Sequence, residues 1–212
     1  MRRFAMTLTM AMAGTAAVAT TAEAATFTIA PVQPCYISGG IVTGTGGAFT
    51  PASQVDVFGD GTRLGDVTAD AAGGFVTPPI TLGRMTGVKT HTLTATDPAN
   101  PALTATASFL GTTNTVTFKP KRATPGTRIR IKGWGFLGGR NVYMHVRGRG
   151  HKSDRRIART NGPCGLFTTR TPIVPAGTSP GTYNLQFDSK RRYSRRTQPA
   201  VLARLRVFRV AG

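Results

Sequence analysis

Short stretches in which apolar and polar residues alternate recur along this chain, and this period of two constrains the fold more than any other feature. Residues 128–132 (RIRIK) and 204–207 (RLRV) alternate strictly, so each would form a strand with one apolar and one cationic face. Helical periodicity is absent, and Glu23 is the only glutamate. Short strands separated by turn signals indicate an all-β protein built as a β-sandwich.

Two turn signals locate hairpins in the first half of the chain. Asp60-Gly61 follows the alternating segment 55–58, and Asp-Gly is a favoured hairpin dipeptide. The segment 97–101 contains two prolines and separates alternating stretches at 90–96 and 102–107. Because proline cannot donate a backbone hydrogen bond, this segment is a turn between two strands.

The N-terminus has the three parts of a secretory signal. Arg2 and Arg3 form a positive region, an apolar stretch follows from residue 4 to about residue 18, and residues 22–24 (AEA) match the small-x-small cleavage pattern. The apolar stretch is too short to span a bilayer comfortably. We therefore expect cleavage before Ala25 and a protein that is secreted or associated with the cell envelope, without a transmembrane anchor.

The rest of the chain repeats itself in four blocks that keep the same order. Four matches in register predict a duplicated domain, with the boundary in the small and polar residues 111–114. The prediction is a signal peptide at 1–24 and two tandem immunoglobulin-like β-sandwich domains at 25–112 and 113–212. The paired blocks are 48–55 with 135–142, 70–75 with 161–167, 77–80 with 169–173, and 87–93 with 180–185.

Three motifs in or overlapping these blocks carry a family resemblance: Gly-x-Gly-Phe at 133–136, an Asp-Ala-x-Gly-Phe-like segment at 70–75 and Pro-Gly-Thr-Tyr at 180–183. Their order resembles that of bacterial immunoglobulin-like domains of the IPT/TIG type, which implies a sandwich fold and names no ligand. The segment 67–73 resembles, more weakly, the neocarzinostatin-like sandwiches. That resemblance implies an alternative function as a carrier of small hydrophobic molecules.

Cys35 and Cys164 are the only cysteines, one in each predicted domain. An even number in an exported protein favours a disulfide. The alternative is two buried free thiols that behave as small hydrophobic residues. Two cysteines alone are too few ligands for a metal site.

Positive charge is concentrated in the second predicted domain. Residues 25–112 contain three Lys and Arg against five Asp, a net charge of −2, whereas residues 113–212 contain 22 Lys and Arg against two Asp, a net charge of +20. Because self-repulsion on this scale destabilises a compact domain, we favour a polyanion-binding role over a merely solvated surface. The candidate binding residues form a strand group and two loop groups: Arg128, Arg130 and Lys132; Arg147, Arg149, Lys152, Arg155 and Arg156; Lys190, Arg191, Arg192, Arg195 and Arg196.

The two loop groups would follow antiparallel strands of an immunoglobulin topology and so lie at opposite ends of the domain. We therefore expect a broad cationic surface and no small basic pocket. The expected partners are anionic wall polymers, acidic glycans or lipid headgroups. Nucleic acid is a less favoured partner because export separates the protein from the genome, although Tyr193 offers a ring for base stacking.

The sequence carries no recognised catalytic motif, so we expect no enzyme activity, no metal and no cofactor. Residues 133–138 match G-x-G-x-x-G, but a dinucleotide site needs a helix next and residues 141–146 favour a strand. His91, His145 and His151 lack metal-binding spacing. Six aromatic residues are assigned to the core of the second domain: Trp134, Phe136, Tyr143, Phe167, Phe187 and Phe208.

Overall fold

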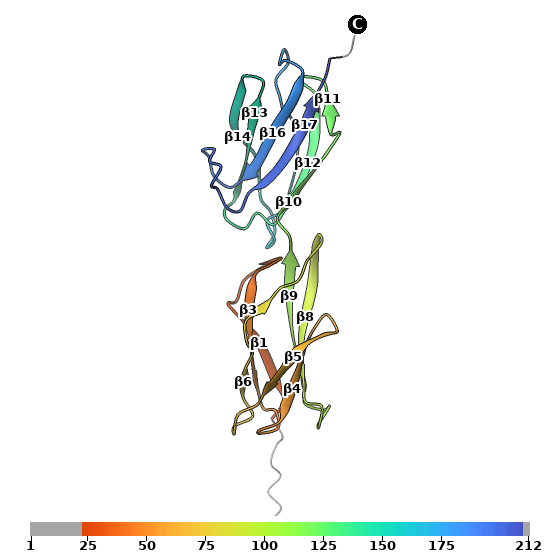
Figure 1. The fold of residues 1–212 in the computed structure, drawn as a ribbon, viewed down its shortest axis with the longest axis vertical. Coiled ribbons are helices and arrows are strands. Elements are labelled where there is room, and N and C mark those ends of the chain that lie inside the picture. The colour runs from red at the N-terminus through yellow and green to blue at the C-terminus, as the bar shows by residue number, and fades with distance from the viewer. Residues whose placement is uncertain (1–22, 210–212) are drawn as a thin grey trace, which may run out of the picture.

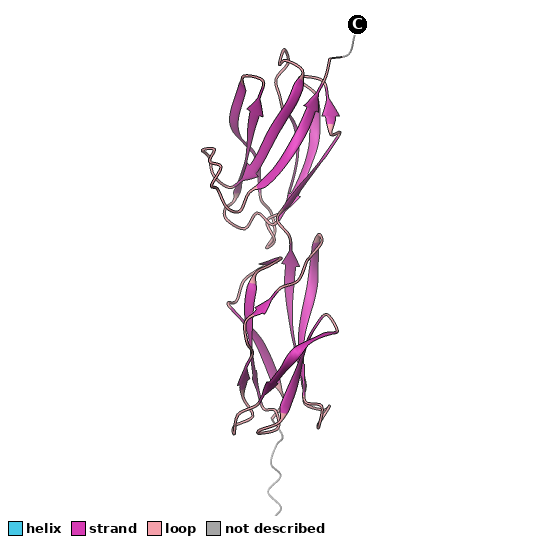
Figure 2. Cartoon of the chain, viewed as in Figure 1, coloured by secondary structure: helices cyan, strands magenta, loops and turns pink. Residues whose placement is uncertain are grey.

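The computed structural model describes residues 23–209, and all regular secondary structure in this range is β-strand (Figures 1 and 2). The prediction of an all-β protein is therefore confirmed. Between residues 23 and 209 there is no helix of the length and apolarity that crossing a membrane requires. The predicted signal at 1–24 lies almost wholly outside the described residues.

Nine strands precede residue 113 and eight follow it. The first nine are β1 (Thr26–Ala30), β2 (Tyr36–Ile37), β3 (Ile41–Gly47), β4 (Gln54–Gly59), β5 (Thr62–Thr68), β6 (Phe75–Val76), β7 (Ile80–Thr81), β8 (Val88–Thr96) and β9 (Thr104–Thr112). The other eight are β10 (Thr115–Lys119), β11 (Arg122–Ala123), β12 (Arg128–Trp134), β13 (Asn141–Gly148), β14 (His151–Arg159), β15 (Phe167–Pro172), β16 (Gly181–Asp188) and β17 (Val201–Val207).

Each half of the chain forms two sheets, and the order of strands is the same in both halves. The first half has the orders β1-β3-β6, with β7 also paired to β3, and β2-β9-β8-β4-β5. The second half has the orders β10-β12-β15 and β11-β17-β16-β13-β14. Even the short parallel pairs correspond, because β2 pairs with β9 as β11 pairs with β17. The four repeated sequence blocks thus fall on matching strands and turns.

Both hairpins expected in the first half are present. β4 and β5 pair around Asp60 and Gly61, whose φ angles of 48° and 80° suit a two-residue hairpin turn. β8 and β9 pair in a continuous ladder from Thr96 opposite Thr104 onward. In the turn between them, Asp97 Oδ1 accepts a hydrogen bond from the backbone N–H of Ala99 (2.9 Å), as short polar side chains do in turns.

Buried hydrophobic residues form two separate clusters, one between the sheets of each half. Ile131 on β12 and Leu205 on β17 come from opposite sheets, and both are at most 1% exposed. This pairing of sheets around an apolar layer confirms the sandwich architecture. It follows from alternation, because every second residue of a half-buried strand faces inward.

The aromatic residues assigned to the second core are only partly confirmed. Trp134 and Tyr143 are partly buried, and the assignment of Phe208 is wrong, since this residue follows the end of β17 and is 42% exposed. Tyr183, which was not assigned, is completely buried and its hydroxyl donates a hydrogen bond to the Ser179 carbonyl (2.7 Å). The three residues that are buried as expected are Phe136, Phe167 and Phe187.

A glycine packs against a phenylalanine backbone at the same place in each half. Gly73 has a φ of 77° and lies against the backbone of Phe49, and Gly165 has a φ of 57° and lies against the backbone of Phe136. A Cβ atom at either glycine would overlap the phenylalanine carbonyl oxygen. These positions therefore require glycine both for the left-handed backbone and for the close approach.

The two halves are joined by a short connection and by a disulfide. Only Thr113 and Asn114 separate β9 from β10, and the halves follow one another along the long axis of the molecule (Figure 1). Cys35 and Cys164, both completely buried, form a disulfide across 129 residues, which confirms the predicted pairing. Next to it, the backbone N–H of Gly135 donates a hydrogen bond to the Cys164 carbonyl (2.8 Å).

The close approach of Gly165 to the Phe136 backbone predicts that adding one methyl group at residue 165 lowers stability strongly. We expect Gly177→Ala to cost about 1 kcal/mol of unfolding free energy, because Gly177 has a φ of 81° with open space around it. Gly165→Ala should cost clearly more, since its Cβ atom also meets the Phe136 carbonyl. Urea unfolding followed by Trp134 fluorescence measures both. Equal losses in the two variants would contradict the steric part of this explanation.

Candidate polyanion-binding surface

The strand group of predicted binding residues lies on one face of β12. Arg128, Arg130 and Lys132 are exposed, whereas Ile129 and Ile131, which alternate with them, are completely buried. Alternation along the strand therefore directs three cations away from the core, as the sequence predicts.

The second group forms a β-hairpin and not the loop that we expected. β13 continues to Gly148 and β14 starts at His151, so only Arg149 and Gly150 form the turn. Both have positive φ angles, 45° and 74°, which is the geometry of a type I′ turn. The sequence did not reveal this hairpin because Arg-Gly is not one of the usual dipeptides of such turns.

Pairing within this hairpin separates the predicted cations onto two faces. Lys152 and Arg156 are exposed on the outer face of β14, whereas Arg155 lies opposite the buried Met144 and is partly buried. Nε and Nη2 of Arg155 are buried without a hydrogen-bond partner, and burial lowers the pKa of this guanidinium. Arg155 therefore faces the sandwich and does not join the outer cationic surface.

The third group lies in the segment 189–200, which connects β16 to β17 and folds back over the outer face of the five-stranded sheet. The Gln186 side-chain amide donates a hydrogen bond to the Ser194 carbonyl (2.9 Å), and the guanidinium carbon of Arg147 lies 4.2 Å from the centre of the Tyr193 ring. The two connections start at opposite ends of the sheet, as expected, because Arg149 of the hairpin turn lies against Gly181, whereas Asp188, after which the segment begins, pairs with Tyr143. The two groups nevertheless meet at Arg147 and Tyr193. They meet because side chains of β13 and β16 hold the segment against the sheet.

A buried histidine is at the centre of this anchor. His145 on β13 is completely buried, with Nδ1 2.9 Å from Oδ1 of Asp154 and Nε2 3.3 Å from Oδ1 of Asp188. Asp188 also accepts hydrogen bonds from the Gln186 side-chain amide (2.6 Å) and from the backbone N–H of Lys190 (2.7 Å). Since residues 113–212 contain no other acidic residue, both carboxylates of this basic region contact one histidine.

The ion pairs of this region leave nearly all of its cations without a carboxylate. Nη2 of Arg147 lies 2.6 Å from Oδ1 of Asp154. Partial burial by itself raises the pKa of Asp154, but hydrogen bonds from His145 and Arg147 outweigh burial, so this pKa lies below its ordinary value. Of the 22 Lys and Arg between residues 113 and 209, Arg147 alone has a carboxylate within 4.0 Å in the structure.

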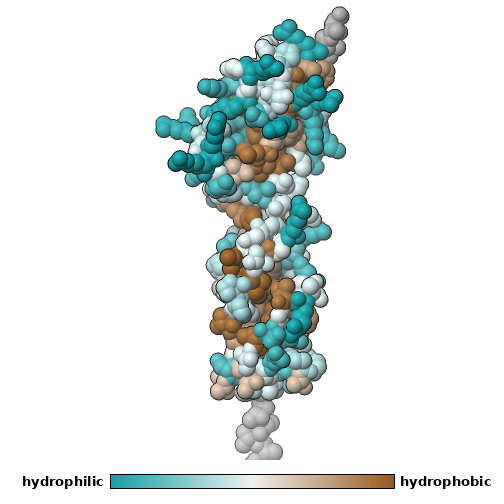
Figure 3. Space-filling model, viewed as in Figure 1, coloured by the Kyte–Doolittle hydropathy of each residue, from teal (hydrophilic) through white to brown (hydrophobic). Residues whose placement is uncertain are grey.

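Two open depressions on the two sides of β17 collect several of these cations. The larger, of about 990 Å³, lies over β16 and β17 beside the folded-back segment. The second, of about 740 Å³, lies between β17 and the β10–β12 pair. Because Ala203 and Arg204 line both depressions, the two meet at β17. Figure 3 shows hydrophilic side chains projecting over much of the visible face of this half.

Five of the thirteen predicted binding residues line these depressions, and three further cations were missed. The strict alternation at 204–207 was a signal for Arg204. No sequence pattern pointed to Lys119 and Lys121, because only the fold brings them into one depression with Arg204 of β17. The predicted residues in the depressions are Arg130, Lys132, Arg147, Lys152 and Arg195. Those outside them are Arg128, Arg149, Arg155, Arg156, Lys190, Arg191, Arg192 and Arg196.

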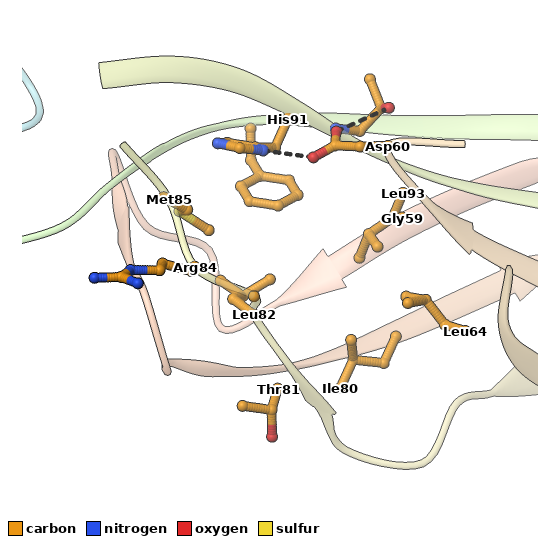
Figure 4. Close-up of a pocket in the computed structure, with 13 residues that line it drawn as sticks. Gly59, Asp60, Leu64, Ile80, Thr81, Leu82, Arg84, Met85, His91 and Leu93 are labelled. Carbon is orange, nitrogen blue, oxygen red and sulfur yellow. Dashed lines mark hydrogen bonds and ion pairs between the residues drawn. The ribbon is translucent and has the colours of Figure 1, made fainter. Parts of the chain in front are cut away.

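The first half contains a small pocket that bears on the alternative of a small-molecule carrier. It has a volume of about 160 Å³ and is lined by apolar residues such as Leu82 and Met85, with His91 at its edge (Figure 4). An adjacent depression of about 310 Å³ shares Leu64 and Ile80 with it. Pockets for drug-sized ligands have volumes of roughly 300–1,000 Å³, so these spaces are at or below the lower limit.

His91 in this pocket is accounted for by a surface ion pair. Its Nδ1 lies 2.6 Å from Oδ2 of Asp60, and Oδ1 of the same carboxylate accepts a hydrogen bond from the Thr92 backbone N–H (2.9 Å). These hydrogen bonds, the one with His91 most strongly, lower the pKa of Asp60. Among residues 23–209, no group of three or more His, Cys, Asp or Glu side chains is arranged so that it could hold a metal ion.

Comparisons with known proteins add likenesses of fold only. No family model and no curated protein matches the chain. The human OSCAR ligand-binding domain is 16% identical with a TM-score of 0.33, covering 87% of this chain and 97% of that one. Red sea bream transglutaminase is 15% identical with a TM-score of 0.32 over 87% of this chain, which spans 31% of that enzyme. A mutant of Salmonella alpha-2-macroglobulin is 13% identical with a TM-score of 0.31 over 88% of this chain, which spans 15% of that protein.

Removing the buried histidine should destabilise the second half. His145→Leu removes a hydrogen-bond partner of the completely buried Asp188, which typically costs about 1–3 kcal/mol. His91→Leu is the matched control, because it breaks a His–Asp pair whose carboxylate is 54% exposed and should cost less than about 1 kcal/mol. Urea unfolding of both variants measures the difference. Similar losses in the two would contradict the anchoring role of His145.

The lowered pKa of Asp154 predicts a loss of stability in acid. Its ionised form is favoured by folding, so its contribution is complete above the unfolded-state pKa of about 3.9 and disappears as the pH falls through the lower folded-state pKa. The stability difference between the wild type and Asp154→Asn should therefore be largest near pH 5 and shrink toward pH 2. Urea unfolding midpoints of both proteins across this pH range test the prediction. A stability difference that grows as the pH falls would contradict it.

Proposed function

We propose that this chain is an exported, non-catalytic binding protein whose basic second half adheres to anionic polymers outside the cell. It consists of two tandem immunoglobulin-like sandwiches, at 25–112 and 113–212, that follow a signal peptide at 1–24. The polymers are wall polymers, acidic glycans or lipid-bound anionic headgroups. Nucleic acid is a less favoured partner, because the signal directs the protein away from the genome.

One observation carries this proposal: 21 of the 22 Lys and Arg between residues 113 and 209 have no carboxylate partner within the described chain. Cations that served only solubility or stability would be interspersed with acidic residues. An uncompensated field of this size attracts polyanions and releases their counterions on contact. The two depressions that meet at Arg204 provide places where such a polymer can contact several cations at once.

The disulfide supports the cellular location in this proposal. Disulfides persist in oxidising compartments and are rare in the cytosol. The bond between Cys35 and Cys164 closes a segment of 129 residues, which stabilises the folded state by about 5 kcal/mol in the chain-entropy view. An exported protein retains that contribution, and this is compatible with a location outside the cytoplasm.

Salt dependence tests the proposed function directly. The mature protein should bind a polyanion such as polygalacturonate at low salt, and the logarithm of its affinity should fall steeply and linearly with the logarithm of salt concentration. The triple variant Lys119→Ser, Arg130→Ser, Arg204→Ser removes cations from the depressions. The slope of log affinity against log salt concentration should become less steep by roughly one for each charge removed, because one counterion fewer is released.

The first half supplies a control with the same number of charges removed. The variant Arg63→Ser, Arg84→Ser, Lys89→Ser removes all three Lys and Arg of residues 25–112 and should leave the slope unchanged. Titration calorimetry at several salt concentrations gives both slopes. Affinity that does not change with salt, or equal slopes in the two triple variants, would count against binding through the second half.

A further inference from the structure

Four outward side chains form a continuous row across the sheet beneath the larger depression. Lys152 on β14 lies directly opposite Arg147 on β13, Arg147 opposite Asn184 on β16, and Asn184 opposite Arg204 on β17. Directly opposed residues of antiparallel strands project from the same face, and adjacent strands lie about 4.8 Å apart. The row therefore runs perpendicular to the strands and leads to the place where the second depression begins.

The row is not purely cationic. Asn184, an exposed neutral amide, occupies the position between the guanidinium groups of Arg147 and Arg204. No hydrogen bond engages the Asn184 side chain within the described residues, so the amide is free to donate and accept. A ligand that carries only negative groups gains little from this position. A ligand with hydroxyl groups between its anions gains a hydrogen bond there.

An aromatic ring and an apolar side chain border the same row. The Tyr193 ring is fixed in place by Arg147, 4.2 Å from its centre, and its segment is held by the hydrogen bond from Gln186 to the Ser194 carbonyl. Leu202 on β17 is 75% exposed and lines the depression. Rings with apolar C–H faces pack on such surfaces, whereas a chain of phosphates has no apolar face to offer.

We propose that this depression binds the sugar units of an acidic glycan, and this inference rests on the function proposed above. Lys152, Arg195 and Arg204 pair with the anionic groups of the glycan, Asn184 hydrogen-bonds to a ring hydroxyl, and Tyr193 and Leu202 contact the apolar faces of the sugar rings. Linear polyphosphate, which shares only the charge, binds the same surface less selectively.

Binding of two ligands of equal charge separates recognition of sugar from attraction of charge. The mature protein is titrated with a polygalacturonate oligomer and with a linear polyphosphate of the same number of charges, at low and at high salt. Both should bind at low salt, since both release counterions. As the salt concentration rises, the affinity for both should fall, but the glycan should lose less of its affinity than polyphosphate, because its hydrogen bond and apolar contacts are not screened by salt.

Asn184→Ala tests the residue that distinguishes the two ligands. We expect it to weaken glycan binding roughly 3- to 10-fold, the effect of one hydrogen bond, and to leave polyphosphate binding unchanged. Thr182→Ala is the matched control, because Thr182 is exposed two residues away on the same face of β16 and does not line the depression. Both positions are exposed, so neither variant should alter folding, which circular dichroism checks.

The outcomes separate this inference from the function on which it rests. Recognition of sugar is overturned if Asn184→Ala weakens the binding of both ligands equally or of neither. It is also overturned if polyphosphate binds more tightly than the glycan at every salt concentration. In both cases the proposal of polyanion binding stands. If neither ligand binds at low salt, the proposed function fails as well. Glycan binding that weakens with salt, but less steeply than polyphosphate binding, and that depends on Asn184 supports both.

Discussion

Electrostatic repulsion among 22 cations is the force that the second half of this protein must overcome to stay folded. The opposing contribution is the apolar layer between its two sheets, where Ile129, Met144 and Leu205 are at most 1% exposed. The alternation of residues along each strand lets the apolar core and the charged surface coexist, because inward positions remain aliphatic while outward positions carry charge. The cations can therefore accumulate on the surface without occupying a single core position on β12 or β17.

The two acidic residues of this half act where repulsion would be most damaging. The segment 189–200 carries five Lys and Arg, yet it lies against a sheet face that already holds Arg147 and Lys152. Asp154 and Asp188 bring negative charge to this crowded face, and both contact His145. The segment held there places Tyr193 against Arg147. This cluster thus shapes the surface that we propose to bind a ligand, although His145 and Asp188 are completely buried.

Sequence patterns predicted those parts of the structure that depend on local periodicity. Strict alternation located the outward cations of β12, Asp60-Gly61 located a hairpin, and two cysteines in a presumed exported chain predicted their pairing. The depressions could not be predicted, because they depend on distant segments. Lys119 and Arg204 are neighbours only through the packing of two sheets, and the fold-back of the segment 189–200 depends on a histidine more than forty residues earlier.

The position of the disulfide determines how the molecule responds to tension. The two ends of the described chain lie at opposite ends of the long axis (Figure 1). The disulfide joins the two halves where Cys35 lies in one depression with Phe136 and Gly165. A pull on both ends passes through the sulfur–sulfur bond, so residues 36–163 lie on a loop that carries no load. Only the stretches before Cys35 and after Cys164 can be drawn out, and the second of these contains β15, β16 and β17. The bond therefore shields strands β2 to β14 from tension, whereas β16 and β17, which line the larger depression, belong to the part of the protein that a pull can open.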